Sequence, residues 1–409
     1  MNDHLDLESF GITPPTPKKK APFSLRNFLA YDNMVLFIVI TVLAMAVRFS
    51  LFPIQSADYR HFLEPWYNHI QNNGYFKALA HGFADYPPMY LYYIVFIAWL
   101  DIDPLVWLKI FSCLFDFITA IFIFKMVRQI YPKNKTYAHI AYALALFLPH
   151  AIMNGSVWGQ CDAIYTCFLV ISIYFLMNKR NIWGLVAFGI AFSFKVQSIF
   201  LLPVFFILFW DEKIKLFDCL IVPLIYFVSV FPAYLAGRPL PELLLIYFNQ
   251  AGTYAHRLQL NYPNIYHWMG DNHTEAFSQA GIILAFSVML LTCFAAKRLK
   301  ASERKTFVID FAYLSMLLLP YLMPHIHDRY SYPADIVAIL YFFQNPKKAY
   351  VPIGLLLITL TPYTGLFNIT FIDYKLLSVG YGILLAMLFR DLWQKYKPAM
   401  LPAIENQAA

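Results

Sequence analysis

The chain has 409 residues, of which 60% are hydrophobic, 19% are aromatic and only 13% are charged. Soluble proteins carry about 25% charged residues, so this composition excludes an ordinary soluble domain and indicates a polytopic helical membrane protein. The net charge of +7 does not indicate nucleic-acid binding, because Lys and Arg punctuate short loops between apolar runs, as expected of cytoplasmic loops.

The first 30 residues are polar and are predicted to form a disordered cytoplasmic tail. They contain three prolines followed by the lysine run 18–20, which places the N-terminus inside under the positive-inside rule. Residues 31–398 are expected to form one transmembrane domain, and 399–409 a second cytoplasmic tail. The five cysteines show no CxxC pair and no disulfide framework.

The transmembrane domain is predicted to be all-α, with about 12 spans and both ends inside. Between the first two spans lies an outer loop, 53–103, in which 59–80 has the amphipathic spacing of an interfacial helix. The apolar piece 89–100 is too short for a normal span and is predicted to be a juxtamembrane or re-entrant helix. A second large outer loop is expected at 237–275, and the predicted spans are 34–52, 104–127, 137–153, 162–177, 182–195, 198–210, 219–236, 276–296, 306–322, 333–344, 349–367 and 374–390.

Polar side chains gather in four clusters that this topology places on the outer face. The first follows directly on the first span, where ionisable groups are costly and usually functional. The second precedes a Pro-Pro pair, the third lies between two spans, and the fourth is the segment MPHIHDRYSYP. With two residues at a further span end, the candidates are Asp58, Arg60, His61 and Glu64; Asp85 and Tyr86; Trp158, Gln160 and Asp162; Lys195 and Gln197; and His325, His327, Arg329 and Tyr330.

These groups suit sugar transfer from an anionic lipid donor. A carboxylate within about 3 Å of an acceptor hydroxyl can take its proton during attack on the anomeric carbon, which accelerates such steps ~10²–10⁴-fold. We expect Asp58 to be this base. Arg329 offers a fork of donors to the leaving phosphate, with His327 and Lys195 as further phosphate ligands. Aromatic and polar residues expected to hold the sugars or shape the pocket are Trp66, Trp158, Tyr330, Tyr254, His256, Arg257, Tyr262 and Trp268.

Each candidate also has a structural alternative. Asp58 can cap an interfacial helix, because Asp is a preferred N-cap residue. Asp85 can be a turn residue before the two prolines, and Gln160 and Asp162 can satisfy backbone groups at helix ends. Lys195 can extend to the lipid headgroups.

The fourth cluster raises two further alternatives. His325 can serve packing alone, and an interfacial arginine such as Arg329 can pair with lipid phosphate. His325, His327 and Asp328 are close enough in sequence to suggest a metal site. A monophosphate donor leaves only one phosphate to neutralise, which Arg and His can do, so we expect no metal.

The clusters together resemble a known family, the GT-C-type glucosyltransferases that use dolichyl-phosphate-glucose in the N-glycan pathway. SADYRHFLEPW (56–66) is similar to the family's first-loop motif, in which an Asp and an aromatic residue precede an Arg-His pair and a Glu. Residues 85–88 resemble its DYPP, 194–203 its YKQM segment and 325–329 its HVHEK. WGQCD (158–162) departs from the family's His-containing motif and is closer to bacterial relatives of the GPI mannosyltransferases.

The resemblance runs in order over about residues 34–345 and implies the GT-C fold and an inverting transfer without a nucleotide sugar, metal or cofactor. It implies a polyprenyl-phosphate-hexose donor carrying glucose or mannose, and a glycan or lipid-linked acceptor. The family role of base is carried to Asp58 and that of phosphate binding to His327 and Arg329. The YKQM-like segment adds Lys195 and Gln197. A small accessory membrane protein or the donor synthase is a further candidate partner.

The expected location is a bacterial inner membrane, with an undecaprenyl-phosphate donor and the active site on the outer face. The sequon Asn154-Gly155-Ser156 lies in the proposed active loop, where a glycan would obstruct it, which favours a prokaryote. Three alternatives stay open: a surface-polysaccharide polymerase or ligase that uses lipid-diphosphate saccharides, a transporter of lipid-linked sugars, and a noncatalytic accessory subunit. A transporter needs polar groups along a path through the bilayer, whereas the predicted mid-span residues are almost all apolar.

Overall fold

The protein is helical and has several segments that can cross a membrane. The computed structural model describes residues 33–253, 256–269, 273–297, 304–367 and 372–396. Within these ranges six helices are long and apolar enough to span: Met34–Leu51, Pro104–Ile130, Leu216–Leu235, Thr274–Ala296, Arg304–Leu322 and Tyr374–Tyr396. A seventh span is formed if Lys135–Phe147 and Pro149–Trp158, which meet at a 41° bend, cross together. The prediction of an all-α polytopic membrane protein is confirmed.

The prediction of 12 spans is not confirmed among the described residues. Several predicted spans are shorter apolar helices, namely Asp162–Met177, Asn181–Phe194, Val196–Trp210 and Tyr350–Gly365. The piece predicted to be juxtamembrane or re-entrant is the helix Pro88–Trp99, which is also short. Their bounds are close to those predicted, but helices of 10–17 residues fall short of the roughly 20 residues that a span needs. The predicted tails 1–30 and 399–409, and Tyr254, lie outside the described residues.

The elements follow one another with few long connections; η marks short 3₁₀ or π-helical segments. The first half comprises α2 (Asn33–Leu51), η2 (Tyr59–Leu63), α3 (Glu64–Asn72), η3 (Tyr75–Ala80), α4 (Pro88–Trp99), α5 (Pro104–Ile130), α6 (Lys135–Phe147), α7 (Pro149–Ala151), η4 (Ile152–Trp158), α8 (Asp162–Met177), α9 (Asn181–Phe194), η5 (Val196–Leu201) and α10 (Leu202–Trp210). The second half comprises α11 (Leu216–Cys219), α12 (Ile221–Leu235), α13 (Leu240–Leu244), α14 (Ile246–Thr253), β1 (Gln259–Leu260), η6 (Ile265–Trp268), α15 (Thr274–Lys297), α16 (Arg304–Leu322), β2 (Ile326–His327), η7 (Asp328–Ser331), α17 (Tyr332–Gln344), η8 (Pro346–Lys348), α18 (Tyr350–Leu360), η9 (Thr361–Phe367) and α19 (Tyr374–Tyr396).

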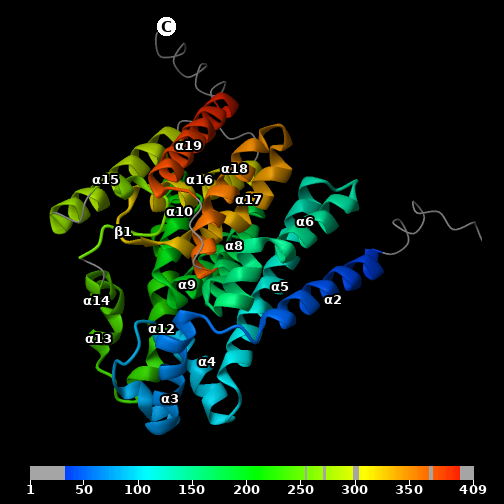
Figure 1. Cartoon of the computed structure of the whole chain (residues 1–409). Helices are drawn as coiled ribbons and strands as arrows, with labels where there is room; N and C mark the ends of the chain where they lie inside the picture. Colours follow the sequence, from blue (N-terminus) through cyan, green and yellow to red (C-terminus); the bar gives the residue numbers. More distant parts are fainter. Residues whose placement is uncertain (1–32, 254–255, 270–272, 298–303, 368–371, 397–409) are drawn as a thin grey trace, which may run out of the picture.

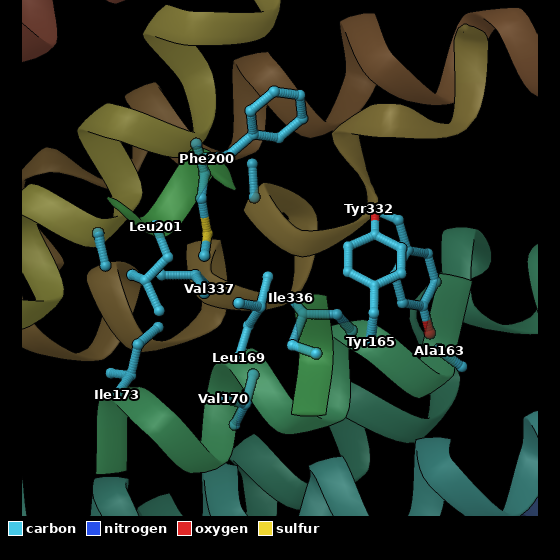
Figure 2. Packing of buried hydrophobic residues seen from close by; sticks show 14 of the residues in the cluster. Ala163, Tyr165, Leu169, Val170, Ile173, Phe200, Leu201, Tyr332, Ile336 and Val337 are labelled. Carbon is cyan, nitrogen blue, oxygen red and sulfur yellow. The ribbon is translucent and has the colours of Figure 1, made fainter. Parts of the chain in front are cut away.

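Helix α8 forms the centre of the bundle. Its side chains Leu169, Val170 and Ile173 pack with Leu201 of η5 and Val337 of α17, and all five are fully buried (Figure 2). By contrast, α2, α12 and α15 expose many large apolar side chains, as expected of helices that face lipid. Because α8 begins at Asp162, the third polar cluster lies at the start of the most central helix.

The second outer loop is held against the fourth cluster by a short parallel strand pair. Gln259 pairs with Ile326, and Leu260 pairs with His327. This pair joins the loop 237–275 to the segment that carries Arg329. Helices α3 and α4 lie at one end of the molecule, whereas the C-terminal end of α19 lies at the opposite end (Figure 1). Two-residue strands are too short for hydrophobic periodicity to predict them.

Buried polar groups are more frequent in the helices than the sequence suggested. Arg48 of α2 pairs with Asp116 of α5 at 3.4 Å, and Tyr332 of α17 donates a 2.5 Å hydrogen bond to the same carboxylate. Arg48 and Asp116 are almost completely buried. Lys109 of α5 donates to the backbone carbonyls of Phe52 and Ile54, just beyond the end of α2. The expectation that mid-span residues are almost all apolar was therefore too simple, although these groups are paired locally.

The Arg48–Asp116 pair predicts a specific pattern of stability. Arg48→Met leaves Asp116 buried and uncompensated, which typically costs about 3–5 kcal/mol. We expect a large drop in thermal unfolding temperature in detergent for Arg48→Met, and a partial recovery in Arg48→Met with Asp116→Asn. If the double variant is no more stable than Arg48→Met, the two charges do not compensate each other.

Candidate active site

All four predicted clusters contribute to one cavity of about 190 Å³. Eight of its lining residues were predicted from the sequence: Asp58, Asp85, Tyr86, Trp158, Gln160, His327, Arg329 and Tyr330. Trp66 was predicted only as a sugar-stacking face, and Asp328 was considered only as a metal ligand. Phe62, Leu63 and Gln250 also line the cavity. Residues separated by more than 250 positions therefore meet at one place.

Asp58 is held in the cavity by the third and fourth clusters. Gln160 Nε2 donates a 2.5 Å hydrogen bond to Asp58 Oδ2, and Arg329 Nη1 lies 3.5 Å from the same oxygen. The Asp58 side chain is 25% exposed, so its carboxylate remains open to a ligand. Its side chain makes no capping hydrogen bond at the start of η2. The alternative that Asp58 serves as a helix cap is therefore not what the structure shows.

Ser56 makes the contacts that position this loop. Its hydroxyl accepts a 3.1 Å hydrogen bond from the Tyr59 N–H and donates a 2.7 Å bond to the Trp158 carbonyl. The backbone of Gln160 is fixed from α5, because Ser112 Oγ donates to its carbonyl at 2.7 Å. Gly159 has a φ of +73°, a left-handed conformation that favours glycine. The turn before Gln160 thus directs its amide towards Asp58.

Arg329 is the cation at the centre of the cavity wall. Its Nε lies 3.4 Å from Asp162 Oδ2, while Nη1 contacts Asp58. The guanidinium also lies over the rings of Trp158 and Tyr330, at 5.6 and 5.9 Å from their centroids. These contacts fix the plane of the guanidinium, which is a condition for bidentate binding of phosphate.

Asp162 and Lys195 form a buried pair behind Arg329. Lys195 Nζ donates a 2.5 Å hydrogen bond to Asp162 Oδ1, and Asn154 Nδ2 donates a 3.0 Å bond to Oδ2. The Lys195 side chain is only 3% exposed, so it does not extend to the lipid headgroups, and it does not line the cavity. Asp162 is 0% exposed. Asp162 therefore contacts side chains of the site, whereas the structural alternative predicted contacts with backbone groups at a helix end.

Two further ionisable groups of the fourth cluster, His327 and Asp328, have displaced pKa values. Burial, together with the charges of Arg329 and Lys195, lowers the pKa of His327 to about 3. The imidazole is therefore neutral at physiological pH and can form hydrogen bonds without adding charge. Burial raises the pKa of Asp328 to about 6, although Arg329 opposes this shift. The Arg329 N–H donates a 2.9 Å hydrogen bond to Asp328 Oδ1.

The second cluster closes the cavity from the side of α4. Tyr86 donates a hydrogen bond to Gln160 Oε1 at 3.4 Å, and its ring contacts Trp66 edge to face at 5.3 Å. Gln250 of α14 donates a 3.0 Å hydrogen bond to the Asp85 carbonyl. No sequence signal singled out Gln250, because it belongs to the predicted outer loop 237–275 and to no recognisable motif. Phe62 and Leu63 follow the catalytic candidate closely in sequence, so the helical spacing after Asp58 could have identified them.

Several predicted residues lie outside the cavity. Arg60 and His61 are exposed and bond within their own turn, to Gln55 and to the Ala57 carbonyl. Glu64 and Gln197 are not lining residues. A role in substrate binding for these four residues stays a prediction.

His325 is separated from the cavity by its own partners. Its Nδ1 lies 2.5 Å from the Arg257 carbonyl, and its Nε2 lies 2.7 Å from Ser278 Oγ. These contacts fit the structural alternative for His325, and its predicted substrate-binding role stays a prediction. Among the described residues, no group of three His, Cys, Asp or Glu side chains could hold a metal ion.

The raised pKa of Asp328 predicts a pH-dependent contribution to stability. The folded protein holds this proton up to about pH 6, whereas an unfolded Asp releases it near pH 4. The stabilisation is therefore complete below about pH 4 and is lost as the pH rises through 6, by about 2–3 kcal/mol in total. We expect the unfolding temperature of Asp328→Asn, relative to wild type, to rise between pH 4.5 and 7.5. A difference that is equal at both pH values would contradict the raised pKa.

Comparisons with known proteins agree with this chemistry. The family model described as dolichyl-phosphate-mannose-protein mannosyltransferase matches residues 85–235, which include the second and third clusters and Lys195. A search of curated proteins finds no match. The narrower resemblance to glucosyltransferases is not confirmed by this match and stays a prediction. The match covers 151 of the 409 residues, so it shows similarity to a glycosyltransferase family over that part of the chain.

Proposed function

We propose that this protein is an inverting glycosyltransferase that moves a hexose from a polyprenyl phosphate to a saccharide acceptor on the outer face of the membrane. One observation carries the proposal: a partly exposed carboxylate, Asp58, lies 3.5 Å from a fixed guanidinium, Arg329, in a cavity rimmed by aromatic rings. A base and an anion-binding group that line the same cavity supply the two functions that displacement of a phosphate by a hydroxyl requires.

Asp58 takes the proton from the attacking hydroxyl. The hydrogen bond from Gln160 occupies Oδ2, which leaves Oδ1 to receive the acceptor proton. As the oxygen attacks the anomeric carbon, the bond from that carbon to the phosphate oxygen breaks on the opposite side. The sugar is thereby inverted, and the polyprenyl phosphate leaves with the bonding electrons.

Arg329 stabilises the negative charge that develops on the leaving phosphate. Asp162 Oδ2 lies 3.4 Å from its Nε, and the attraction between the two charges favours an orientation in which the terminal nitrogens of the guanidinium face the cavity. His327 is neutral and supplies hydrogen bonding rather than charge. Lys195 acts on the phosphate indirectly, because its ammonium neutralises Asp162 and so keeps that carboxylate from cancelling the charge of Arg329.

The polyprenyl chain has an apolar groove available beside the same segments. A groove of about 250 Å³ lies between α10, α15 and α16, and its lining is almost entirely apolar. Ile199 and Leu202 of this groove follow closely on Lys195, and Met323 precedes His325. A lipid tail held here would have its phosphate near the charged cluster. The matched family description names a dolichyl-phosphate-mannose donor, which favours mannose over glucose; in a bacterium the carrier would be undecaprenyl phosphate.

Transfer from a labelled donor tests the proposal. Membranes loaded with polyprenyl-phosphate-mannose or polyprenyl-phosphate-glucose should transfer label with the wild-type protein, and Asp58→Asn should lose at least about 10²-fold in rate because it lacks the base. Asp101→Asn is a matched control, since Asp101 lies on the same outer loop, bonds to Gln71 and does not line the cavity. Equal transfer by wild type and Asp58→Asn would refute Asp58 as the base. Consumption of lipid-diphosphate saccharides alone would replace the proposal by the polymerase alternative.

Substitution of Arg329 by lysine tests the guanidinium separately from its charge. Lys keeps one positive charge but loses the planar fork and the stacking on Trp158 and Tyr330. We expect Arg329→Lys to lower kcat by at least about tenfold, because the leaving phosphate is less well stabilised in the transition state. Single-turnover measurements with preloaded donor would show this loss in the chemical step. An unchanged single-turnover rate would show that charge alone is sufficient.

A further inference from the structure

A second polar cavity lies beside the catalytic one. It has a volume of about 480 Å³, which falls in the range of small-molecule sites. Its lining residues come from β1, η6 and the start of α19, and they are Gln259, Asn261, His267, Ile372, Asp373, Tyr374 and Lys375. The mechanism proposed above uses none of them.

The two cavities share a wall. Asn261, which lines the second cavity, forms a β-bridge with His327, which lines the catalytic cavity. Bridged residues of this kind have Cα atoms about 4.5–5.5 Å apart. A ligand of several units can therefore have one end at Asp58 and the remainder in the second cavity.

The lining has the chemistry of a site for a neutral, polyhydroxylated ligand. Gln259 and Asn261 supply amides, which can both donate to and accept from hydroxyl groups. Asp373 and Lys375 bring opposite charges that cancel. A site for a free phosphate would instead present mainly cations and N–H donors. The balance of donors and acceptors therefore favours a saccharide over an anion.

Two aromatic rings belong to the lining, and a third, that of Trp268, lies beside it against Lys375. The rings of His267 and Tyr374 are stacked, with centroids 4.8 Å apart. Trp268 is 60% exposed, and the Lys375 ammonium lies 5.7 Å from its ring centroid. His267 donates from Nε2 to the Tyr262 carbonyl at 2.8 Å, so Nδ1 is the acceptor of this ring. An exposed indole beside hydrogen-bonding groups can cover the apolar face of a sugar while its hydroxyls are bound.

We propose that this cavity is the acceptor subsite and that it holds the sugar units of a neutral saccharide that precede the reacting hydroxyl. The inference rests on the proposed function. A peptide acceptor fits less well, because peptides are commonly bound along exposed strand edges, and the strands here are two residues long.

The test uses the full-length protein in lipid nanodiscs with labelled polyprenyl-phosphate-mannose. Two reactions are followed: hydrolysis of the donor by water, and transfer to a neutral mannose tetrasaccharide at increasing concentration. Asn261→Gly removes the amide and tolerates the left-handed backbone at this position, where φ is +61°. Trp268→Ala removes the exposed ring. Trp99→Ala is the matched control, because Trp99 is exposed to a similar extent, 66%, and does not line either cavity.

Both variants should raise the KM for the tetrasaccharide at least about fivefold more than they alter donor hydrolysis, and the control should not. An unchanged KM in both variants would overturn the acceptor subsite. A rise in the KM of a Ser/Thr-rich peptide acceptor, with the KM for the tetrasaccharide unchanged, would overturn it as well. A wild-type protein that neither hydrolyses nor transfers from the donor would instead refute the proposed function, so the two failures are distinguishable.

Discussion

The arrangement of the site depends on how Arg329 shares its charge between two carboxylates. Asp162, which is inaccessible to solvent, contacts Nε, while Asp58, which is partly accessible, contacts Nη1. If Arg329 were its only cation, the buried Asp162 would take up most of the positive charge of the guanidinium. Lys195 already compensates Asp162, so this charge remains available to Asp58 and to a bound phosphate. Because buried charges are costly unless paired, this row of alternating charges holds together four chain segments. The row, called the charge ladder below, consists of Lys195, Asp162, Arg329 and Asp58. Asp58 lies at the exposed end of the ladder, where a substrate can reach it.

The fold was predictable where it follows from the length of the apolar segments and the positions of the charged residues. The six long helices coincide with predicted spans, because runs of about 20 apolar residues are distinctive. The break at Lys195 agrees with the predicted boundary between two spans, whereas the break after Phe147, just before Pro149, falls inside a predicted span and was missed. The paired Arg48 and Asp116 were also missed, since a single sequence does not show which polar residues meet.

Residue type alone singled out several residues that line the cavity. Asp58, Gln160, His327 and Arg329 were chosen because clusters of polar and ionisable groups at a membrane face are often functional. The sequence could not show that Ser56, rather than Asp58, bonds to the first turn of η2, or that Lys195 faces Asp162. Both facts depend on tertiary contacts between distant segments. Gln250 was beyond prediction, because an isolated glutamine in a predicted loop is ordinary in sequence; in the structure it lies in α14 and donates to the Asp85 carbonyl.

Lys109 gives the cavity region a long-range electrostatic bias. Its ammonium is bonded to the carbonyls that follow α2, and its side chain lies close to Gly159, next to Gln160. The two carboxylates of the charge ladder balance its two cations, and Asp328 adds a further negative charge once the pH exceeds its pKa of about 6. The ammonium of Lys109 offsets this further charge and so reduces the negative potential that an anion meets near the cavity. A contact at the end of a helix thus also makes it easier for a phosphate headgroup to approach the cavity before any direct contact is made.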